Sequence, residues 1–173
     1  MHLQRSFQQH LLRYVLTAAI FMLAMLLGAT PLGTFAGGAF YPLFSIMLLY
    51  YLAVFQASLV PSWLVFLLGL IQDVMLGIPT GMSSLLLLLF RLLIVWQRRF
   101  VAGQHFVVLW IGFALASAVF FFVLWAALSL YHYDARPALG FVLQWLAAAT
   151  LYPLVHSLMQ YAIVKLRILQ PEK

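Results

Sequence analysis

Three ionisable side chains interrupt long apolar stretches of this sequence, and they are the first candidates for chemistry. They are Asp73, Arg91 and His156. A charge inside the hydrocarbon of a membrane costs on the order of 2.5–3.5 kcal/mol on insertion scales, so such residues are functional candidates. Histidine titrates near neutral pH, and an arginine can meet a phosphate headgroup. Whether either does so here depends on the segments that hold them.

Asp73 stands in a regular glycine pattern with a spacing of four residues. The pattern consists of Gly69, Asp73, Gly77 and Gly81. Residues four apart share one face of a helix, so the first three would form a narrow groove around one carboxylate. Glycine allows another backbone to approach closely. Because Pro79 ends the helix, the free N–H groups at the start of the next helix can receive the carboxylate. The pattern predicts that Asp73 ties the two helices together, or that the groove contacts a partner.

Arg91 and His156 have less specific surroundings. Asp73 and Arg91 would lie at levels roughly 10 Å apart, so we expect Arg91 to extend towards the cytoplasmic headgroups, with a direct ion pair as the alternative. His156 follows Pro153 by one turn. Because proline frees a carbonyl, His156 and Gln160 could satisfy that group or bond across helices. A proton relay through His156 is the less favoured alternative.

No catalytic or metal-binding pattern is present in the sequence. The chain has no cysteine, which excludes disulfides, cysteine zinc sites and thiol nucleophiles. It also lacks the motifs of zinc peptidases, serine hydrolases and phosphate-binding loops. The remaining histidines show no ligand spacing: His2, His10, His105 and His132. We therefore expect no enzyme activity, no cofactor and no metal.

Composition defines the class of protein. Of 173 residues, 66% are hydrophobic and only 7% are charged, whereas a soluble domain has about 25% charged residues. This balance excludes a soluble enzyme and a disordered tail. Continuous apolar blocks also argue against a membrane β-barrel, whose strands alternate. The net charge of +6 comes from basic residues in ones and twos beside apolar blocks, so we expect no nucleic acid partner. The sequence predicts an all-α membrane protein.

Turn residues divide the apolar sequence into six predicted helices. No charged residue occurs between Tyr14 and Gln72, which is too long for one span of roughly 20 residues. Five breaks rich in glycine, proline or polar residues define the helices. Their expected bounds are about 14–30, 42–60, 61–77, 82–97, 105–131 and 138–165. The third and fourth are the short ones. We expect one six-helix transmembrane domain over residues 1–173.

Basic residues give the predicted orientation. With six helices, one side of the membrane receives nearly all of them: Arg5, Arg13, Arg98, Arg99, Lys165, Arg167 and Lys173. The other side receives only Arg136. Positive charge marks the cytoplasmic side, so both termini are predicted to be cytoplasmic. A five-helix arrangement would separate the two basic tails, which is less favourable. The first apolar segment is predicted to be a retained helix and not a cleaved signal peptide.

The chain resembles MreD, the small integral membrane subunit of the bacterial rod-shape system. The resemblance rests on the pattern Gly69-x3-Asp73-x3-Gly77-x3-Gly81, the six helices, the short basic start, the near-absence of loops and the overall length. It covers essentially the whole chain, although only the central pattern is specific. Arg91 corresponds to no known feature of the family.

The resemblance implies a non-enzymatic scaffold in the bacterial inner membrane that supports lateral peptidoglycan synthesis and rod shape. Its implied partners are a single-span MreC-like protein, a RodA-like glycan polymerase, a class B penicillin-binding transpeptidase and, directly or indirectly, the MreB filament. The family is also similar in fold to the six-helix substrate-binding subunits of energy-coupling-factor vitamin transporters. A transport subunit is therefore the main alternative, favoured by the Gly/Pro turn between two short helices. A third interpretation, a lipid handler, would use Arg91, Arg98 and Arg99 to meet a phosphate headgroup.

Overall fold

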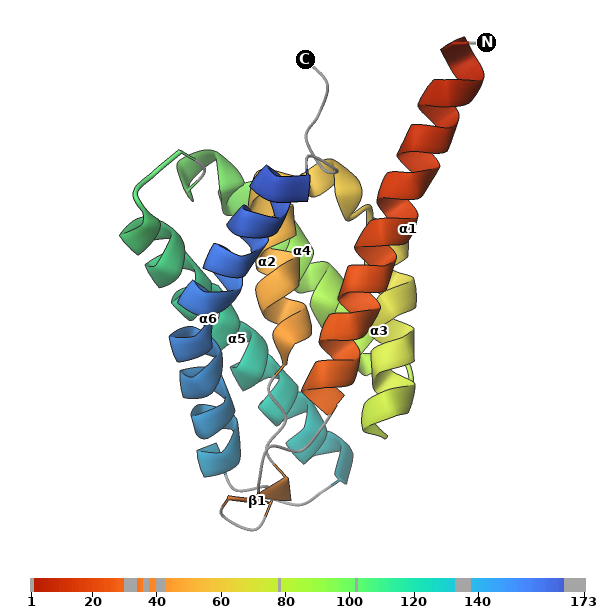
Figure 1. Cartoon of the computed structure of the whole chain (residues 1–173). Helices are drawn as coiled ribbons and strands as arrows, with labels where there is room; N and C mark the ends of the chain where they lie inside the picture. Colours follow the sequence, from red (N-terminus) through yellow and green to blue (C-terminus); the bar gives the residue numbers. More distant parts are fainter. Residues whose placement is uncertain are drawn as a thin grey trace.

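The computed structural model describes residues 2–29, 34–35, 38–39, 43–77, 79–101, 103–132 and 138–166. Within them the chain forms a helical bundle (Figure 1). The helices are α1 (His2–Ala29), α2 (Phe44–Phe55), α3 (Ser62–Leu76), α4 (Met82–Val101), α5 (Phe106–His132) and α6 (Ala138–Leu166). A 3-10 turn, η1 (Ala57–Leu59), follows α2. One feature was not predicted from the sequence, since β1 (Thr34–Phe35) pairs antiparallel with β2 (Gly38–Ala39).

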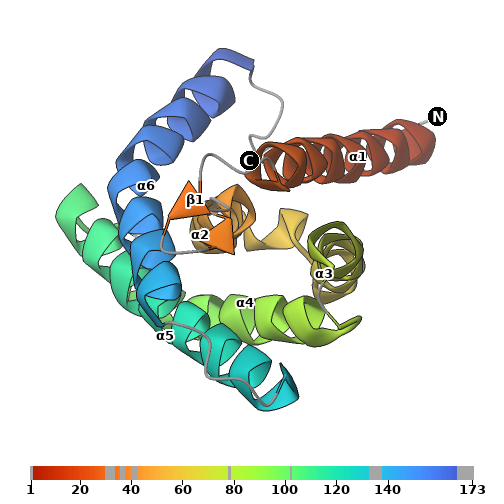
Figure 2. The ribbon, with the colours of Figure 1, turned by 90° about the horizontal axis from the view of Figure 1, so that it is seen from below.

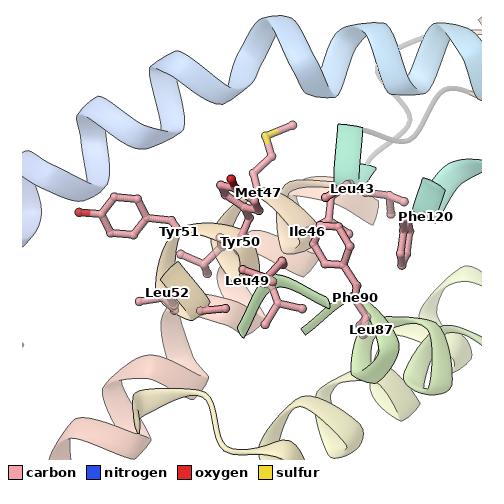
Figure 3. Close-up of a cluster of buried hydrophobic side chains, with 14 of the residues drawn as sticks. Leu43, Ile46, Met47, Leu49, Tyr50, Tyr51, Leu52, Leu87, Phe90 and Phe120 are labelled. Carbon is pink, nitrogen blue, oxygen red and sulfur yellow. The ribbon is translucent and has the colours of Figure 1, made fainter. Parts of the chain in front are cut away.

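Helix α2 is the centre of the bundle. Every residue from Ser45 to Val54 is buried, and the end-on view shows α2 with the other helices arranged around it (Figure 2). Its side chains pack in all directions, against Leu87 and Phe90 of α4 and Phe120 of α5 among others (Figure 3). A helix that is apolar all round is a buried helix. At 12 residues, α2 is only about 18 Å long, but its neighbours cover it.

The outer helices present apolar side chains on the outside of the bundle. Leu23 on α1, Val74 on α3, Leu92 on α4, Phe122 on α5 and Leu158 on α6 are each more than half exposed. Soluble monomers rarely expose contiguous apolar surface on this scale. Two helices are long and apolar enough to cross a membrane, by length and composition, over Phe106–Tyr131 and Leu139–Tyr161. Shorter apolar segments occupy Arg13–Gly28, Phe44–Phe55 and Ser62–Met75. The described surface suits a hydrocarbon environment.

Three helix bounds differ from the sequence prediction. Helix α1 starts at His2 and not near residue 14, because residues 2–13 contain no proline or glycine and a helix need not end where apolar residues end. Helix α2 ends at Phe55 and not near residue 60, six residues before Pro61. Helix α4 continues to Val101, since glutamine and arginine are good helix formers and arginines suit a helix C-terminus. At 20 residues, α4 is not one of the short helices; α2 and α3 are.

Two connections and the outer ends of both terminal helices lie at one end of the bundle (Figure 1). Helix α1 begins and α6 ends at the same end of the bundle, where the α2–α3 and α4–α5 connections also lie (Figure 1). Arg98 and Arg99 in the last turn of α4 are at this end. The short β1–β2 pairing is at the opposite end.

Candidate functional site

The carboxylate of Asp73 binds the start of the next helix. Asp73 is in the last turn of α3 and is fully buried. Its Oδ2 accepts hydrogen bonds from the backbone N–H of Gly81 at 2.8 Å and from the hydroxyl of Ser84 at 3.2 Å. Its Oδ1 accepts the backbone N–H of Ser83 at 2.8 Å. The aspartate thus occupies the anion-binding position that every helix N-terminus offers.

Asp73 replaces the side chain that usually caps a helix from its own first residue. Gly81 is the N-cap of α4, since its carbonyl accepts the N–H of Leu85 at 3.0 Å, and glycine has no side chain to bond the free amides. A carboxylate from α3 therefore supplies the cap. Negative charge near a helix N-terminus is also favoured by the helix dipole. These contacts are those that the sequence pattern predicts for Asp73.

Each glycine of the pattern has a separate steric reason. A Cβ on Gly69 would lie 2.3 Å from the Cα of Ser84, so only glycine allows α3 and α4 to approach this closely. Gly77 has a positive φ of 62° and ends α3, its N–H bonding the carbonyls of Asp73 and Val74. Gly81 also has a positive φ, at 100°, in the turn that starts α4. We give the name α3–α4 latch to the residues of the pattern together with the two serines: Gly69, Asp73, Gly77, Gly81, Ser83 and Ser84.

The groove that the sequence pattern predicts is occupied by the chain itself. Ser84 of α4 fills the space over Gly69, and the donors around Asp73 come from the turn and from α4. Both serines of the latch are buried. Of the two roles predicted for this groove, the geometry supports helix packing within the chain.

Arg91 joins α4 to the connection between α2 and α3. Its Nε donates a hydrogen bond to the carbonyl oxygen of Val60, and its Nη1 donates to the hydroxyl of Ser62 at 3.1 Å. Arg91 therefore extends towards the α2–α3 connection, at the end of the bundle that carries Arg98 and Arg99, as expected, but a backbone carbonyl receives the guanidinium. The hydrogen bonds of Arg91 go to the start of α3, whereas Asp73 lies in the last turn of α3. The alternative of a direct ion pair between Arg91 and Asp73 is therefore wrong.

His156 packs as a ring and does not bond the carbonyl that Pro153 frees. Its imidazole lies 5.1–6.0 Å, centroid to centroid, from four aromatic rings. These rings belong to Tyr51, Phe55, Phe106 and Tyr152. The side chain is 6% exposed, and its Nδ1 has no hydrogen-bond partner. The predicted bond from His156 or Gln160 is thus wrong for His156, and another residue takes the carbonyl.

That residue is a tryptophan of the neighbouring helix. Pro153 cannot donate to the carbonyl of Ala149, four residues before it. The indole Nε1 of Trp110, on α5, donates to this oxygen at 2.8 Å. In the reciprocal direction, Nε1 of Trp145 on α6 donates to the carbonyl of Ala114 on α5 at 2.9 Å. We call Trp110 and Trp145 the tryptophan clamp, and it joins α5 to α6.

Sequence reasoning missed the clamp, although a signal for it exists. A tryptophan within an apolar helix still needs an acceptor for its N–H. A proline inside the next helix indicates that the carbonyl four residues earlier lacks its helical donor. A similar signal applies to Tyr50, whose buried hydroxyl donates to the carbonyl of Leu109 at 3.1 Å and thereby fastens the central helix to α5.

The basic residues predicted to set orientation are distributed as follows. Arg13, Arg98 and Arg99 are half-buried or exposed, and the guanidinium of Arg99 lies 4.9 Å from the ring centroid of Phe100. Arg5 and Lys165 lie in α1 and α6. Arg167 and Arg136 lie outside the described residues. Within the described part of the chain, no three histidine or acidic side chains are grouped so that they could hold a metal ion.

The fold and the latch define a helical membrane protein whose buried polar groups connect its own helices. The comparison with protein-family models gives a specific match: the model of the rod shape-determining protein MreD matches residues 8–162. The chain therefore belongs to the MreD family, the membrane proteins of the rod shape-determining system. No curated protein and no solved structure matches it.

Proposed function

We propose that this protein is a non-enzymatic, multi-pass scaffold of the bacterial inner membrane that supports lateral peptidoglycan synthesis and rod shape. All six helices would cross the membrane or lie within its thickness, with both termini in the cytoplasm. The observation that carries the proposal is the family match over residues 8–162. The resemblance of the glycine–aspartate pattern to the same family points in the same direction.

The use of the polar groups supports a scaffold. Asp73 caps α4, Arg91 binds the α2–α3 connection, and Trp110 bonds a carbonyl of α6. Each of these groups hydrogen-bonds another part of the bundle. The outward faces of α3, α4 and α5 carry large exposed apolar side chains, and such faces are available to lipid and to other transmembrane helices. A bundle built in this way offers surfaces for assembly.

The partners we propose are those that the family resemblance implies. They are an MreC-like single-span protein, a RodA-like glycan polymerase, a class B penicillin-binding transpeptidase and, directly or through these, the MreB filament. The basic residues at the end of the bundle shared by Arg98 and Arg99 would face the cytoplasm, as positive charge does in membrane proteins.

Gentle cross-linking of the tagged protein in its native membrane, followed by mass spectrometry, tests the proposed assembly. We expect recovery of a single-span coiled-coil protein together with a glycan polymerase and a transpeptidase. Recovery of paired ATPases with a coupling subunit would replace the scaffold by a substrate-binding transport subunit. A small molecule bound tightly to the purified protein would support the same replacement.

The six-span arrangement has its own test, which the absence of cysteine makes direct. Thr80 in the α3–α4 turn and Gln104 in the α4–α5 turn are both exposed. In the proposed orientation, a Thr80→Cys variant reacts with a membrane-impermeant maleimide added outside the inner membrane, and a Gln104→Cys variant reacts only after the membrane is opened. Labelling of both from outside would contradict the arrangement.

A further inference from the structure

An apolar pocket of about 370 Å³ opens on the outer surface between α5 and α6. Its walls are formed by Ala118, Phe121, Phe122, Trp125, Phe141, Val142 and Trp145. The volume falls within the range of about 300–1,000 Å³ that small-molecule sites occupy. The pocket is separate from the α3–α4 latch, and neither the family match nor the proposed scaffold role assigns it a ligand.

One wall of this pocket is held rigidly. The indole N–H of Trp145 donates to the carbonyl of Ala114, so this nitrogen is already paired and the ring is fixed across the two helices. Phe121, which lines the same pocket, is buried. A pre-formed wall reduces the ordering that binding would require. The occupant therefore meets a fixed aromatic surface.

The lining residues distinguish a hydrocarbon chain from a partner helix. Transmembrane helices associate through small residues, which let two backbones approach closely. Five of the seven lining residues here are aromatic, and aromatic side chains keep a second backbone at a distance. A flexible chain of methylene groups can enter between such rings. The lining thus favours an acyl chain over a transmembrane helix of a partner or of a second copy.

The position of the pocket along the helices indicates which part of the membrane supplies the acyl chain. All lining residues lie within the two stretches apolar enough to cross a membrane, Phe106–Tyr131 and Leu139–Tyr161. Phe122 at its mouth is 65% exposed. On α6 the lining begins at Phe141, close to the start of the helix at Ala138. In the proposed orientation that end faces the outside of the inner membrane.

We infer that this pocket binds one acyl chain of a phospholipid from the outer leaflet of the surrounding membrane. The inference rests on the proposed membrane orientation and is independent of the proposed partners. The chain enters between Phe122 and Val142, and the bound lipid is a resident component of the bundle that covers the gap between α5 and α6.

Native mass spectrometry of the purified full-length protein, released from detergent micelles, tests this inference. The wild type is expected to retain a phospholipid. Ala118→Phe places a ring within the pocket, and displacing about two methylene groups from apolar contact weakens binding roughly tenfold. Val119→Phe is the matched control, because Val119 is on the same helix, 55% exposed and outside the lining. Equal retention by all three proteins, or retention by none, would overturn the inference.

A second measurement does not depend on detergent. Replacing Trp63, Trp96 and Trp110 by phenylalanine leaves Trp125 and Trp145, both in the pocket, as the only tryptophans. In vesicles with a small fraction of phospholipid brominated on the acyl chain, we expect their fluorescence to be quenched more than that fraction predicts. Adding Ala118→Phe should reduce the quenching to the statistical value. Statistical quenching before that substitution would refute a bound chain, whatever the cross-linking experiment on partners shows.

Discussion

The α3–α4 and α5–α6 hairpins are both antiparallel helix pairs, yet they are joined by different chemistry. In the first, a buried carboxylate bonds free backbone N–H groups at 2.8 Å, and Gly69 brings the two backbones together. In the second, Trp110 and Trp145 donate to backbone carbonyls across the interface. The first joint uses a charged side chain and a glycine, which has no side chain, whereas the second uses two large uncharged side chains.

The difference follows from the backbone groups that each hairpin leaves unpaired. A tight turn into α4 exposes amide donors, and donors require an acceptor, for which a carboxylate is the strongest choice. Proline inside α6 exposes a carbonyl, and an acceptor requires a donor that is stable in an apolar environment, for which an indole N–H serves. The first hairpin should therefore be more sensitive to single substitutions than the second.

The largest effect is expected at Asp73. Asp73→Ala leaves the buried amide of Ser83, the part-buried amide of Gly81 and the hydroxyl of Ser84 without an acceptor, and each buried group of this kind costs about 1–3 kcal/mol. We expect the free energy of unfolding in mixed micelles to fall by about 3–5 kcal/mol. Ser84→Ala removes only the weakest of the three contacts and should cost about 1 kcal/mol. Equal effects of the two substitutions would refute the cap.

Gly69→Ala should have the next largest effect. The added Cβ would meet the Cα of Ser84, which is backbone and cannot move aside as a side chain does. Overpacking of this kind costs about 2–3 kcal/mol, measured by the same unfolding assay. Gly140→Ala is the matched control in α6, since nothing lies within 4 Å of its added Cβ. That variant should gain up to about 1 kcal/mol, because alanine is the better helix former. A control as unstable as Gly69→Ala would remove the steric explanation.

Arg91→Met tests whether the connection between α2 and α3 depends on α4. The substitution removes the charged donor to Val60 and Ser62. Hydrogen bonds to charged groups contribute about 1.5–3 kcal/mol, so we expect a loss of about 2 kcal/mol and faster proteolysis at Gln56–Pro61. Arg91→Lys keeps the charge but not the forked arrangement of donors. Its stability and its rate of proteolysis should lie between those of the wild type and of Arg91→Met. Unchanged proteolysis would show that Arg91 acts only as a topology signal.

Single substitutions in the tryptophan clamp should have smaller effects. Trp110→Phe and Trp145→Phe each remove one neutral hydrogen bond, which contributes about 1 kcal/mol. Trp110→Phe should be the more destabilising of the two, because Pro153 has no N–H and the Ala149 carbonyl therefore lacks its usual helical donor. The Ala114 carbonyl also accepts the hydroxyl of Ser117 at 3.1 Å. Thermal unfolding in detergent would rank the two variants, and the reverse order would contradict this account of the clamp.

The smallest effect is expected at His156. Its Nδ1 is buried without a partner, and replacing an unsatisfied polar group by an apolar group of similar shape is nearly neutral or stabilising. His156→Phe should therefore change stability by less than about 1 kcal/mol in either direction. Loss of rod shape in cells that express a stable His156→Phe protein would instead support the alternative hypothesis of a proton relay through His156.

The latch was predictable from sequence because its parts are close together in the chain. A carboxylate in an apolar helix, glycines every four residues and a proline at the turn fix where the donors must be, and Asp73 reaches them within eleven residues. The bounds of α3, α5 and α6 follow from their turn residues to within one residue. Polar helix formers extended α1 and α4 beyond the apolar stretches from which their bounds were predicted.

The clamp and the central position of α2 were not predictable in the same way. Trp110 and Ala149 are 39 residues apart, and only the packing of α5 on α6 shows which carbonyl meets which indole. The apolar sequence at 42–60 does not reveal that α2 ends at Phe55. It also does not reveal that the Val60 carbonyl, after η1, is bonded by Arg91, 31 residues away. Local patterns determine local contacts, whereas these depend on the assembled bundle.

The most direct test of the central claim, that Asp73 caps α4 within the chain, is amide hydrogen exchange in the Asp73→Asn protein. The variant keeps the shape of the side chain and removes its charge. We expect exchange in the first turn of α4, at Gly81 and Ser83, to accelerate by about tenfold, the equivalent of ~1.4 kcal/mol, while the α5–α6 hairpin keeps its protection. Unchanged protection at Ser83, together with loss of partner proteins in cross-linking, would show instead that the glycine–aspartate pattern is a surface for another protein.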